Sequence, residues 1–426
     1  MESLLQNLKG TKDFMPEEQQ IRNKIRNVLE EVFQNYGYRP LETPILCQYD
    51  LLASKYAGGS EILKEVYRLK DQGNRDLGLR YDLTVPFCKV IGANPTLQLP
   101  FKRYEIGKVF RDGPVKTGRL REFVQCDVDV VGVKDTIAEA ELMSLTFEVF
   151  RRLGMGVYIQ YNNRKLLTGL LEFAGVNKDL INDVILTMDK IEKIGEDAVK
   201  EELVQKGITE DMLSKLFDLL NEDFSLSDFQ DSPNVNIREG IAEIRELQSY
   251  LSGLELMTKT QLNLFLARGL GIYTGTVFEV FLSDGCIQSS IASGGRYDKI
   301  IGKFLDSGQE YPAVGISFGL DVIYTAMELK AEAQKKSPVD LLIIPMGTQV
   351  EALRLACALR KKDIKVEIEL RSIKLKKSLD YANKQGIPYV VILGEDELNK
   401  GCVKIKDMSS GVEKELVIAE IEKFNF

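Results

Sequence analysis

The strongest constraint on the fold is a segment in which two strand-like runs flank a long loop, Phe101 to Gly132 (FKRYEIGKVFRDGPVKTGRLREFVQCDVDVVG). The loop extends from Asp112 to about Leu120, is rich in glycine and basic residues, and has Arg111 and Arg121 at its two ends. Hairpin loops usually have about two to five residues, and longer ones are often functional. A mobile basic loop in water is the simplest interpretation of this segment.

The second strand, FVQCDVDVV, argues against that simple interpretation because its side chains alternate in character. Successive side chains of a strand point to opposite faces of the sheet. One face contains Val124, Cys126, Val128 and Val130, and the other contains Gln125, Asp127 and Asp129. The pattern predicts an apolar core on one side and, on the other, a polar space below the arginines. Such a space suits a substrate with a phosphate at one end and an amine at the other.

Length and composition predict an ordinary globular protein. A chain of 426 residues, 44% hydrophobic and 28% charged, is expected to form two or three domains. Its first residues, MESLLQNLKGTKDF, are polar, and no apolar run approaches the roughly 18 residues of a membrane span. The six cysteines form no CxxC pair, which favours reduced thiols. We therefore expect a cytoplasmic protein without a membrane segment.

The chain contains no histidine. Nucleophiles activated by a histidine base, histidine-ligated zinc and imidazole acid–base catalysis are therefore excluded. Any catalysis has to depend on carboxylates, arginine, lysine, tyrosine, bound ions and the positioning of substrates.

Patterns along the chain indicate a large N-terminal part, a linker and a small C-terminal part. An apolar stripe predicts a helix from Pro16 to Tyr36, and the acidic segment from about Asn177 to Leu254 indicates an inserted helical module. Strands are expected at LNLFLARGLGIYTGTVFEVFL and CIQSSIASGGRYD. Met327 to Pro338 is charged and lacks a pattern, so we expect a linker there.

Beyond the linker, strand and helix patterns alternate: VDLLIIPM, Glu351 to Lys361, KVEIEL, Lys374 to Lys384 and YVVILG. This order predicts a small βαβαβ domain with a largely parallel sheet. Although the net charge of the chain is −8, Arg354 to Lys377 contains nine basic and three acidic residues. A solvated helix face and a surface that follows nucleic-acid phosphates both explain such a run.

The sequence contains neither of the common glycine-rich nucleotide-binding motifs. No GxxxxGK[ST] occurs, and RGLGIYTG fails as a dinucleotide fingerprint because a strand is expected after it. Any ATP must therefore be held by arginines and a sheet surface. Arg268 follows an apolar run, where an internal salt bridge or an anionic ligand would satisfy it. The glycines of SGGRYD suit either a tight turn or a close approach to a ligand.

Together these motifs resemble a class II aminoacyl-tRNA synthetase, and specifically the histidyl-tRNA synthetase family, over nearly the whole chain. GTKDFMP and YRPLETPIL are similar to the region of the first class II motif, KVFRDGPVKTGRLREFVQCDVDVVG to the second, and AVGISFGLD to the third. LARGLGIYTGTVFE and SGGRYD resemble the two histidine-specific segments, and GIPYVVILGEDEL resembles part of the anticodon-binding domain.

The resemblance implies an α+β catalytic domain built on an antiparallel sheet at residues 1–326, with the helical insertion at about 177–254. A linker at 327–338 and an α/β anticodon-binding domain at 339–426 follow. The activity implied is ATP-dependent ligation of L-histidine to tRNA(His) through a histidyl-adenylate, with Mg²⁺, in a homodimer.

The resemblance also implies roles for four arginines. Arg111 would hold the α-phosphate of ATP and the carboxylate of the amino acid, and Arg268 would stabilise charge at the α-phosphate from the opposite side. Arg119 and Arg121 would bind the distal phosphates. Two anions react in this step, so positive charge is needed where they meet.

Histidine would be held by a second set of residues. By resemblance, Asp82, Thr84 and Gln125 would receive the α-ammonium group, and Asp129 and Tyr273 would hydrogen-bond the two ring nitrogens. A site that reads both nitrogens rejects apolar or amide analogues, because an unpaired buried carboxylate is costly.

The chain departs from the family's pattern at several positions. Val322 stands where the third motif has an arginine for the ATP γ-phosphate, and Gly113 stands where the second motif usually has a glutamate. Gly271 and Ile272 replace an acid and a tyrosine. Two other interpretations are a histidine-binding regulatory relative that controls histidine biosynthesis, and an RNA-binding relative without catalysis. The regulatory relative lacks an anticodon-binding domain, so the C-terminal domain favours the enzyme.

Overall fold

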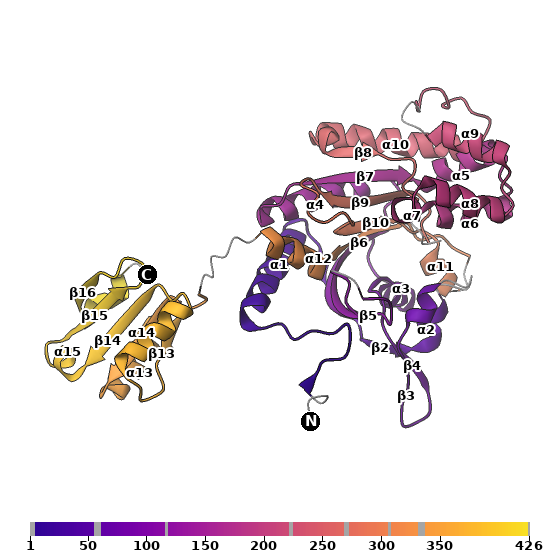
Figure 1. The fold of residues 1–426 in the computed structure, drawn as a ribbon. Coiled ribbons are helices and arrows are strands. Elements are labelled where there is room, and N and C mark those ends of the chain that lie inside the picture. Colours follow the sequence, from indigo (N-terminus) through magenta and orange to yellow (C-terminus); the bar gives the residue numbers. More distant parts are fainter. Residues whose placement is uncertain are drawn as a thin grey trace. The chain divides into compact units, whose positions relative to one another are not determined.

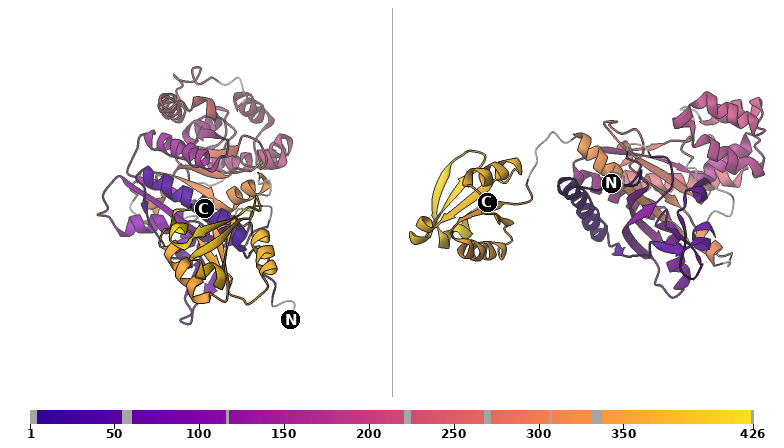
Figure 2. Two further views of the ribbon diagram at one scale, coloured as in Figure 1. Left: turned by 90° about the vertical axis from the view of Figure 1, so that its left-hand side faces the viewer. Right: turned by 60° about the horizontal axis from the view of Figure 1, so that its bottom comes forward.

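The computed structural model describes residues 5–54, 61–115, 118–220, 225–267, 272–305, 308–330 and 337–424. The chain forms two compact units, Met1–Lys330 and Ala331–Phe426, and each is considered by itself (Figures 1 and 2). Among the described residues, no helix is both long enough and apolar enough to cross a membrane.

An eight-stranded sheet forms the centre of the first unit (Figure 1). Its strands follow the order β1 (Arg39–Pro40), β5 (Phe101–Phe110), β6 (Glu122–Val131), β11 (Ala313–Gly319), β10 (Ala292–Arg296), β9 (Thr276–Leu282), β7 (Val157–Asn163) and β8 (Thr260–Leu262). Neighbours from β5 to β7 are antiparallel, and only the outermost strands β1 and β8 pair in parallel. The predicted α+β unit on an antiparallel sheet is therefore confirmed.

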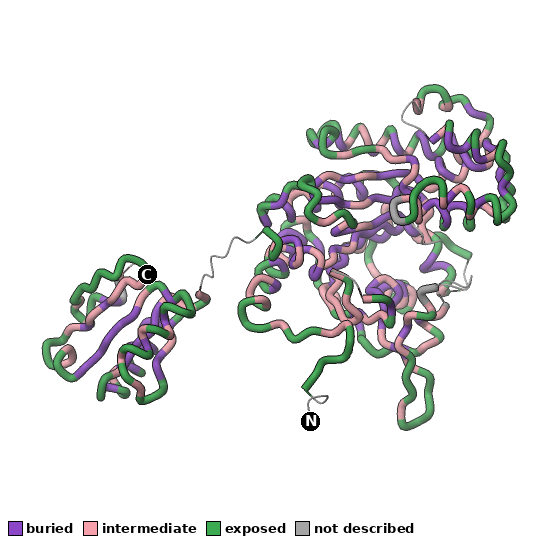
Figure 3. The backbone as a smooth tube through the Cα atoms, in the orientation of Figure 1, coloured by how far each residue is buried: buried purple, intermediate pink, exposed green. Residues whose placement is uncertain are grey.

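The apolar face of the sheet packs against three helices, α1 (Pro16–Asn35), α4 (Ile137–Leu153) and α12 (Leu320–Lys330). Cys126, Val128 and Val130 of β6 are buried in this core, as their alternation predicted. The ring of Phe318 lies between two helices, 5.8 Å from Phe33 and 6.0 Å from Phe150 between ring centroids. Figure 3 shows the buried strands between partly exposed helices.

The other face of the sheet carries smaller elements that enclose the polar side chains of β6. They are α3 (Thr84–Ala93), α11 (Ile300–Phe304), α2 (Tyr49–Ser54), the 3-10 helix η2 (Glu61–Glu65), and a three-stranded sheet of β2 (Leu46–Gln48), β4 (Asp76–Leu79) and β3 (Arg68–Lys70). α3 and α11 form a separate apolar cluster that includes Phe87, Tyr297 and Val131. This arrangement leaves a polar space between the cluster and the middle of the sheet.

A group of helices lies between β7 and β8. They are α5 (Arg164–Phe173), α6 (Ile181–Met188), α7 (Ile191–Ile194), α8 (Glu196–Gln205), α9 (Glu210–Leu220) and α10 (Val235–Gly253). α5 and α10 cross closely because glycines face each helix at the contact. A Cβ at Gly169 would lie 2.7 Å from the backbone nitrogen of Ile237, and one at Gly240 would overlap the backbone of Leu166.

The second unit is a five-stranded sheet in the order β13 (Val366–Ile368), β12 (Leu341–Met346), β14 (Tyr389–Gly394), β15 (Cys402–Asp407) and β16 (Glu413–Val417). The parallel βαβαβ part, with α13 (Gln349–Arg360) and α14 (Leu375–Lys384), confirms the prediction. The antiparallel strands β15 and β16 were not predicted, because β16 is mostly exposed and its sequence is polar.

Three expectations were wrong in detail. Of the segment CIQSSIASGGRYD, expected as strand, only Ala292–Arg296 form one, β10. α12 continues to Lys330, so the first residues of the expected linker are helical; the hydroxyl of Tyr324 donates to Glu328 Oε1 at 2.9 Å, one turn further along this helix. Residues 263–267, expected as strand, form none, and the chain turns at Leu264 and Phe265 instead. The buried amide of Asn162 donates to the carbonyls of both Leu264 (3.0 Å) and Leu266 (2.9 Å), which bends the chain around one side chain.

Candidate active site

The predicted long hairpin is present. β5 ends at Phe110 and β6 begins at Glu122, and the backbone N–H of Arg111 donates to the carbonyl of Arg121 at 2.8 Å. Both arginines therefore stand at the base of the loop, as expected. Lys116 and Thr117 lie outside the described residues.

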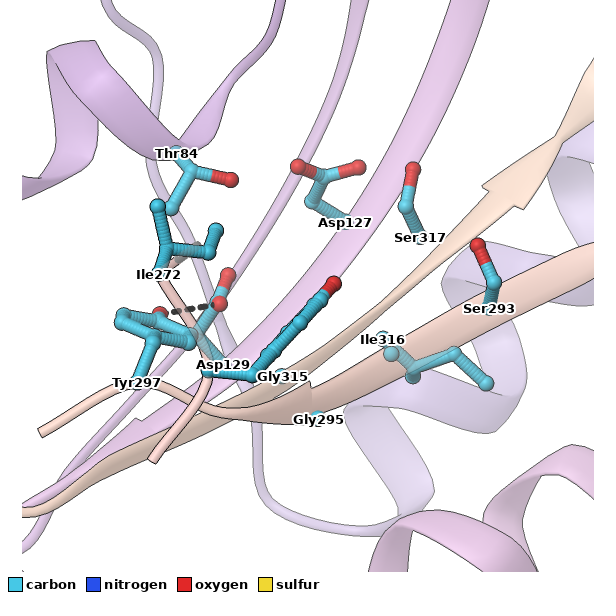
Figure 4. A pocket seen from close by; sticks show the side chains of 12 residues that line it. Thr84, Asp127, Asp129, Ile272, Ser293, Gly295, Tyr297, Gly315, Ile316 and Ser317 are labelled. Atoms are coloured by element: carbon cyan, nitrogen blue, oxygen red, sulfur yellow. Dashed lines mark hydrogen bonds between the residues drawn. The ribbon is translucent and has the colours of Figure 1, made fainter. Parts of the chain in front are cut away.

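A pocket opens on the polar face of β6 (Figure 4). It is lined by Thr84, Asp127, Asp129, Ile272, Tyr273, Ser293, Gly294, Gly295, Tyr297, Gly315, Ile316 and Ser317. The glycines make room for the polar groups: a Cβ at Gly315 would overlap the carboxylate of Asp129, and one at Gly295 would lie 2.8 Å from the ring of Tyr273. Within the segment SGGRYD, Ser293–Arg296 therefore belong to strand β10 and Tyr297 follows it; Ser293, Gly294, Gly295 and Tyr297 line the pocket.

Asp129 is held by two buried partners. Its Oδ2 lies 2.8 Å from Nη2 of Arg103, and its Oδ1 accepts a hydrogen bond from the hydroxyl of Tyr297. The guanidinium of Arg103 also lies 4.2 Å from the ring centre of Phe87. Burial alone would lower the pKa of Arg103, but the surrounding anions, led by Asp129, raise that pKa above its ordinary value. Arg103 and Asp129 therefore form a charged pair.

Arg103 and Tyr297 were not among the predicted site residues. The register of the hairpin contains the signal for Arg103, since Arg103 lies directly opposite Asp129 on the neighbouring strand. The pKa of Tyr297 is raised well above its ordinary value by burial and by the charge of Asp129, so the hydroxyl stays protonated and donates.

Asp127 differs from Asp129 in its surroundings. Burial raises the pKa of Asp127 to about 7; Arg103 acts in the opposite direction, and Asp129 adds to the rise. This carboxyl group therefore titrates near neutral pH, which is the behaviour of many functional groups.

The residues predicted to receive the α-ammonium group are only partly in the pocket. Thr84 lines it, and the buried Asp82 accepts a hydrogen bond from the backbone N–H of Val85 at 3.0 Å, at the start of α3. Gln125 donates through Nε2 to Ser317 Oγ at 3.2 Å, while its buried Oε1 has no hydrogen-bond partner in the described part of the chain. Asp82 and Gln125 thus border the pocket without lining it.

The predicted phosphate-binding arginines lie at the hairpin loop and do not line this pocket. Nε of Arg111 donates to the carbonyl of Tyr81 at 3.0 Å, and Nε of Arg121 donates to that of Gly113 at 3.2 Å. Arg119 is held less tightly than these two arginines. Its side chain is 51% exposed, and its Nη2 lies 3.7 Å from Oε2 of Glu65. Arg268 and Gly271 lie outside the described residues.

The structure shows what surrounds two of the residues that depart from the family's pattern, Gly113 and Val322. At Gly113, a Cβ would lie 2.8 Å from Oε1 of Glu65, so a carboxylate from η2 occupies the space beside the loop. Val322 is partly buried in the core, and a Cβ at Gly118 would lie 3.8 Å from it. A partly buried apolar side chain thus stands at the position of the missing arginine.

Comparison with known proteins agrees with this geometry. The family model for histidyl-tRNA synthetase matches residues 10–323, and the model for the anticodon-binding domain matches residues 340–424. Histidine–tRNA ligase 1 of Bacillus cereus is 52% identical over 424 residues, which is 99% of each chain. Histidine–tRNA ligase 2 of Shouchella clausii is 52% identical over 413 residues, covering 96% of this chain and 97% of its own.

Solved structures give the same result. The histidyl-tRNA synthetase of Nostoc sp. PCC 7120 superimposes with a TM-score of 0.85 at 30% identity over 98% of each chain. A Bacillus halodurans protein described as an ATP phosphoribosyltransferase regulatory subunit/histidyl-tRNA synthetase has a TM-score of 0.76 at 19% identity, which indicates a shared fold. From the family model and the full-length relatives together, the chain belongs to the histidyl-tRNA synthetase family.

Proposed function

We propose that this chain catalyses the ATP-dependent ligation of L-histidine to tRNA(His) through a histidyl-adenylate. The observation that carries the proposal is the pocket itself, which brings Thr84 and Tyr273 together with Asp129 of the sheet that carries the basic hairpin loop. Residues 1–326 would form the catalytic domain, and residues 339–426 would bind the anticodon. A cytoplasmic homodimer is the assembly that the family resemblance favours.

Histidine recognition is proposed to depend on Asp129 and Tyr273. Arg103 and Tyr297 hold Asp129 in place, which supports a role as a hydrogen-bond acceptor for one ring nitrogen. The ring of Tyr273 lies against Gly295, where its hydroxyl is proposed to meet the other nitrogen. A ligand that lacks either ring nitrogen would leave a buried polar group unpaired, which is the basis of strong rejection.

Activation is proposed to take place between this pocket and the loop. Arg111 would hold the carboxylate and the α-phosphate, Arg268 would act on the α-phosphate from the other side, and Arg119 and Arg121 would bind the distal phosphates. Positive charge placed before the reaction stabilises the charge that develops as the phosphoanhydride bond breaks and pyrophosphate leaves.

Mg²⁺ is proposed to assist by neutralising the phosphate charge. Among the described residues, no group of three or more acidic or cysteine side chains is arranged to hold a metal by itself. Glu65 and Asp112, beside the loop, offer carboxylates that suit a Mg²⁺ ion bound mainly through the phosphates of ATP.

The test is ATP–pyrophosphate exchange with each amino acid, followed by aminoacylation of tRNA(His), with Arg268→Ala as the control. We expect exchange with histidine alone and its loss in the control. Histidine binding without exchange would instead place the protein with the regulatory relatives and would contradict the proposal.

A further part of the proposal follows from the absence of histidine in the chain. An enzyme without histidine can be translated while charged histidyl-tRNA is scarce, which suits a backup synthetase used in histidine starvation. Its synthesis rate should then hold steady during histidine depletion. A fall in parallel with histidine-containing proteins would contradict this idea.

A further inference from the structure

Asp127 is a buried carboxylate in the pocket to which no role has been given. Its side chain lines the pocket beside Asp129, and the residue is only 4% exposed. Its Oδ1 is buried and has no hydrogen-bond partner in the described part of the chain. Within the same part, no lysine or arginine forms an ion pair with it, whereas Asp129 lies 2.8 Å from Arg103.

The neighbouring strands do not neutralise Asp127. Directly opposite it on β5 is Glu105, whose own charge is met by Arg80 at 2.7 Å and by the hydroxyl of Thr43 at 2.9 Å. Directly opposite it on β11 is Ser317, whose hydroxyl lowers the pKa of Asp127. A hydroxyl only partly compensates a buried carboxylate, so this position costs stability in the free protein.

Other charged and titratable groups also face Asp127. Arg103 favours its ionised form, while Asp129 and Asp82 disfavour it. Tyr273 and Tyr297 line the same pocket, but a protonated tyrosine brings no positive charge. Since no cation in the described part of the chain forms an ion pair with Asp127, a positively charged ligand group suits its ionised form.

The position of Asp127 along β6 indicates which cation that is. From the loop end of the strand, the polar face presents Gln125, then Asp127, then Asp129. The reacting carboxylate of an amino acid has to face the loop, and Asp129 is proposed to hold the ring. The α-ammonium group lies between these two ends of histidine, which is the level of Asp127.

Figure 4 shows that Asp127, Thr84 and Ser317 point into one space. We propose that Asp127 is a further histidine-binding residue, whose carboxylate pairs with the α-ammonium group of the substrate beside Thr84. This inference rests on the proposed function and extends it, because the ammonium site then contains a buried counter-ion.

A protonation change accompanies this binding mode. Near neutral pH, part of the free protein has Asp127 protonated. An arriving ammonium group favours the carboxylate, so Asp127 releases its proton to solvent while the ammonium keeps its own. The affinity for histidine should therefore increase as pH rises from about 6 to 8.

The first experiment compares Asp127→Asn with the unchanged protein in ATP–pyrophosphate exchange at several pH values. We expect KM for histidine to rise roughly 10- to 100-fold, the loss expected for a charge-assisted hydrogen bond, and KM for ATP to change less than about twofold. The imidazole of free histidine also titrates and affects both proteins. The readout is therefore the difference between the two proteins in how KM for histidine depends on pH. Asp218→Asn, an exposed exchange on α9, is the matched control and should change nothing.

The second experiment needs no catalysis and separates this inference from the proposed function. Calorimetry measures the binding of histidinol, which has an ammonium group, and of imidazolepropionate, which has none. Asp127→Asn should weaken histidinol binding and leave imidazolepropionate binding unchanged. Equal losses for both ligands, or an unchanged histidinol affinity, would overturn the inference. If the unchanged protein shows no ATP–pyrophosphate exchange but Asp127→Asn still weakens histidinol binding, only the proposed function is contradicted.

Discussion

Arg103 and Asp129 form an ion pair across β5 and β6, with 2.8 Å between Nη2 and Oδ2, and both residues are almost completely buried: Arg103 is 0% exposed and Asp129 is 3% exposed. Such a pair contributes little to net stability, because two charges have lost their hydration. Its value here is positional, since it holds an ionised carboxylate at a fixed place in the wall of the pocket.

Arg103→Met is expected to destabilise the protein by about 3–5 kcal/mol, because it leaves Asp129 buried without its cation. The double variant Arg103→Met/Asp129→Asn removes both charges, so it should recover most of that loss in a thermal unfolding experiment. Histidine-dependent exchange should stay low in both variants. If the double variant is as unstable as Arg103→Met, the unpaired charge of Asp129 is not the cause of the destabilisation.

Gly315 allows the carboxylate of Asp129 to lie against the backbone of β11. A Cβ at this position would overlap that carboxylate and would also come within 2.9 Å of the carbonyl of Val128. Gly315→Ala should therefore raise KM for histidine at least about tenfold and lower the melting temperature by several degrees. Gly253→Ala, at the end of α10, is the control. A Cβ at Gly253 would meet no atom within 4 Å, so this substitution should leave stability unchanged or raise it by up to about 1 kcal/mol.

The sequence was a good guide to the hairpin and a poorer guide to what surrounds Asp129. Alternation along β6 placed Asp127 and Asp129 on one face because a strand's period is fixed by its backbone. Arg103 was missed because its partner depends on the register of β5 against β6, and the loop between them was too long to set that register by turn type. Tyr297 follows β10, far along the chain from β6, so only the assembled fold reveals its contact with Asp129.

The same limit applies to Gly113, where the sequence indicated only an absent glutamate. Glu65 occupies the adjacent space from a different element, and the N–H of Asp112 donates to its backbone carbonyl at 2.7 Å. Contacts of this kind depend on tertiary packing, which no local pattern encodes.

Gly113→Glu is therefore expected to impair the enzyme, although it restores the residue usual in the family. The new carboxylate would meet that of Glu65, so KM for ATP in the exchange assay should rise roughly tenfold through like-charge repulsion. Gly113→Ala should have an effect of less than about threefold, since its Cβ meets only the movable end of Glu65. Adding Glu65→Ala to Gly113→Glu should lower KM for ATP again. The prediction assumes that the carboxylate of Glu65 takes the place of the glutamate usual at position 113. A lower KM for ATP in Gly113→Glu alone would contradict that assumption.

Arg119 and Arg121 are expected to differ in what their removal changes. Arg119 is half exposed and lies 3.7 Å from its acidic neighbour, so Arg119→Ala should leave the melting temperature unchanged and raise KM for ATP roughly 10- to 100-fold. Arg121 donates to the carbonyl of Gly113 and lies 3.2 Å from Asp112, so Arg121→Ala should also loosen the loop and lower kcat. Unchanged KM for ATP in Arg119→Ala would remove that residue from the phosphate site.

The stability of the protein should reveal the burial of Asp127 independently of activity. Because the pKa of Asp127 in the folded protein is raised from 3.8 to about 7, the folded state binds its proton more tightly than the unfolded state. That contribution is fully present below the unfolded pKa and is lost as pH rises through about 7, where the ionised carboxylate has to be kept buried. Asp127→Asn should therefore be more stable than the unchanged protein by roughly 1–4 kcal/mol at pH 8, with a smaller gain at pH 5. The measurement is thermal unfolding at both pH values beside Asp218→Asn. Saturating histidine should reduce the difference at pH 8, because the bound ammonium group stabilises the ionised form that only the unchanged protein contains.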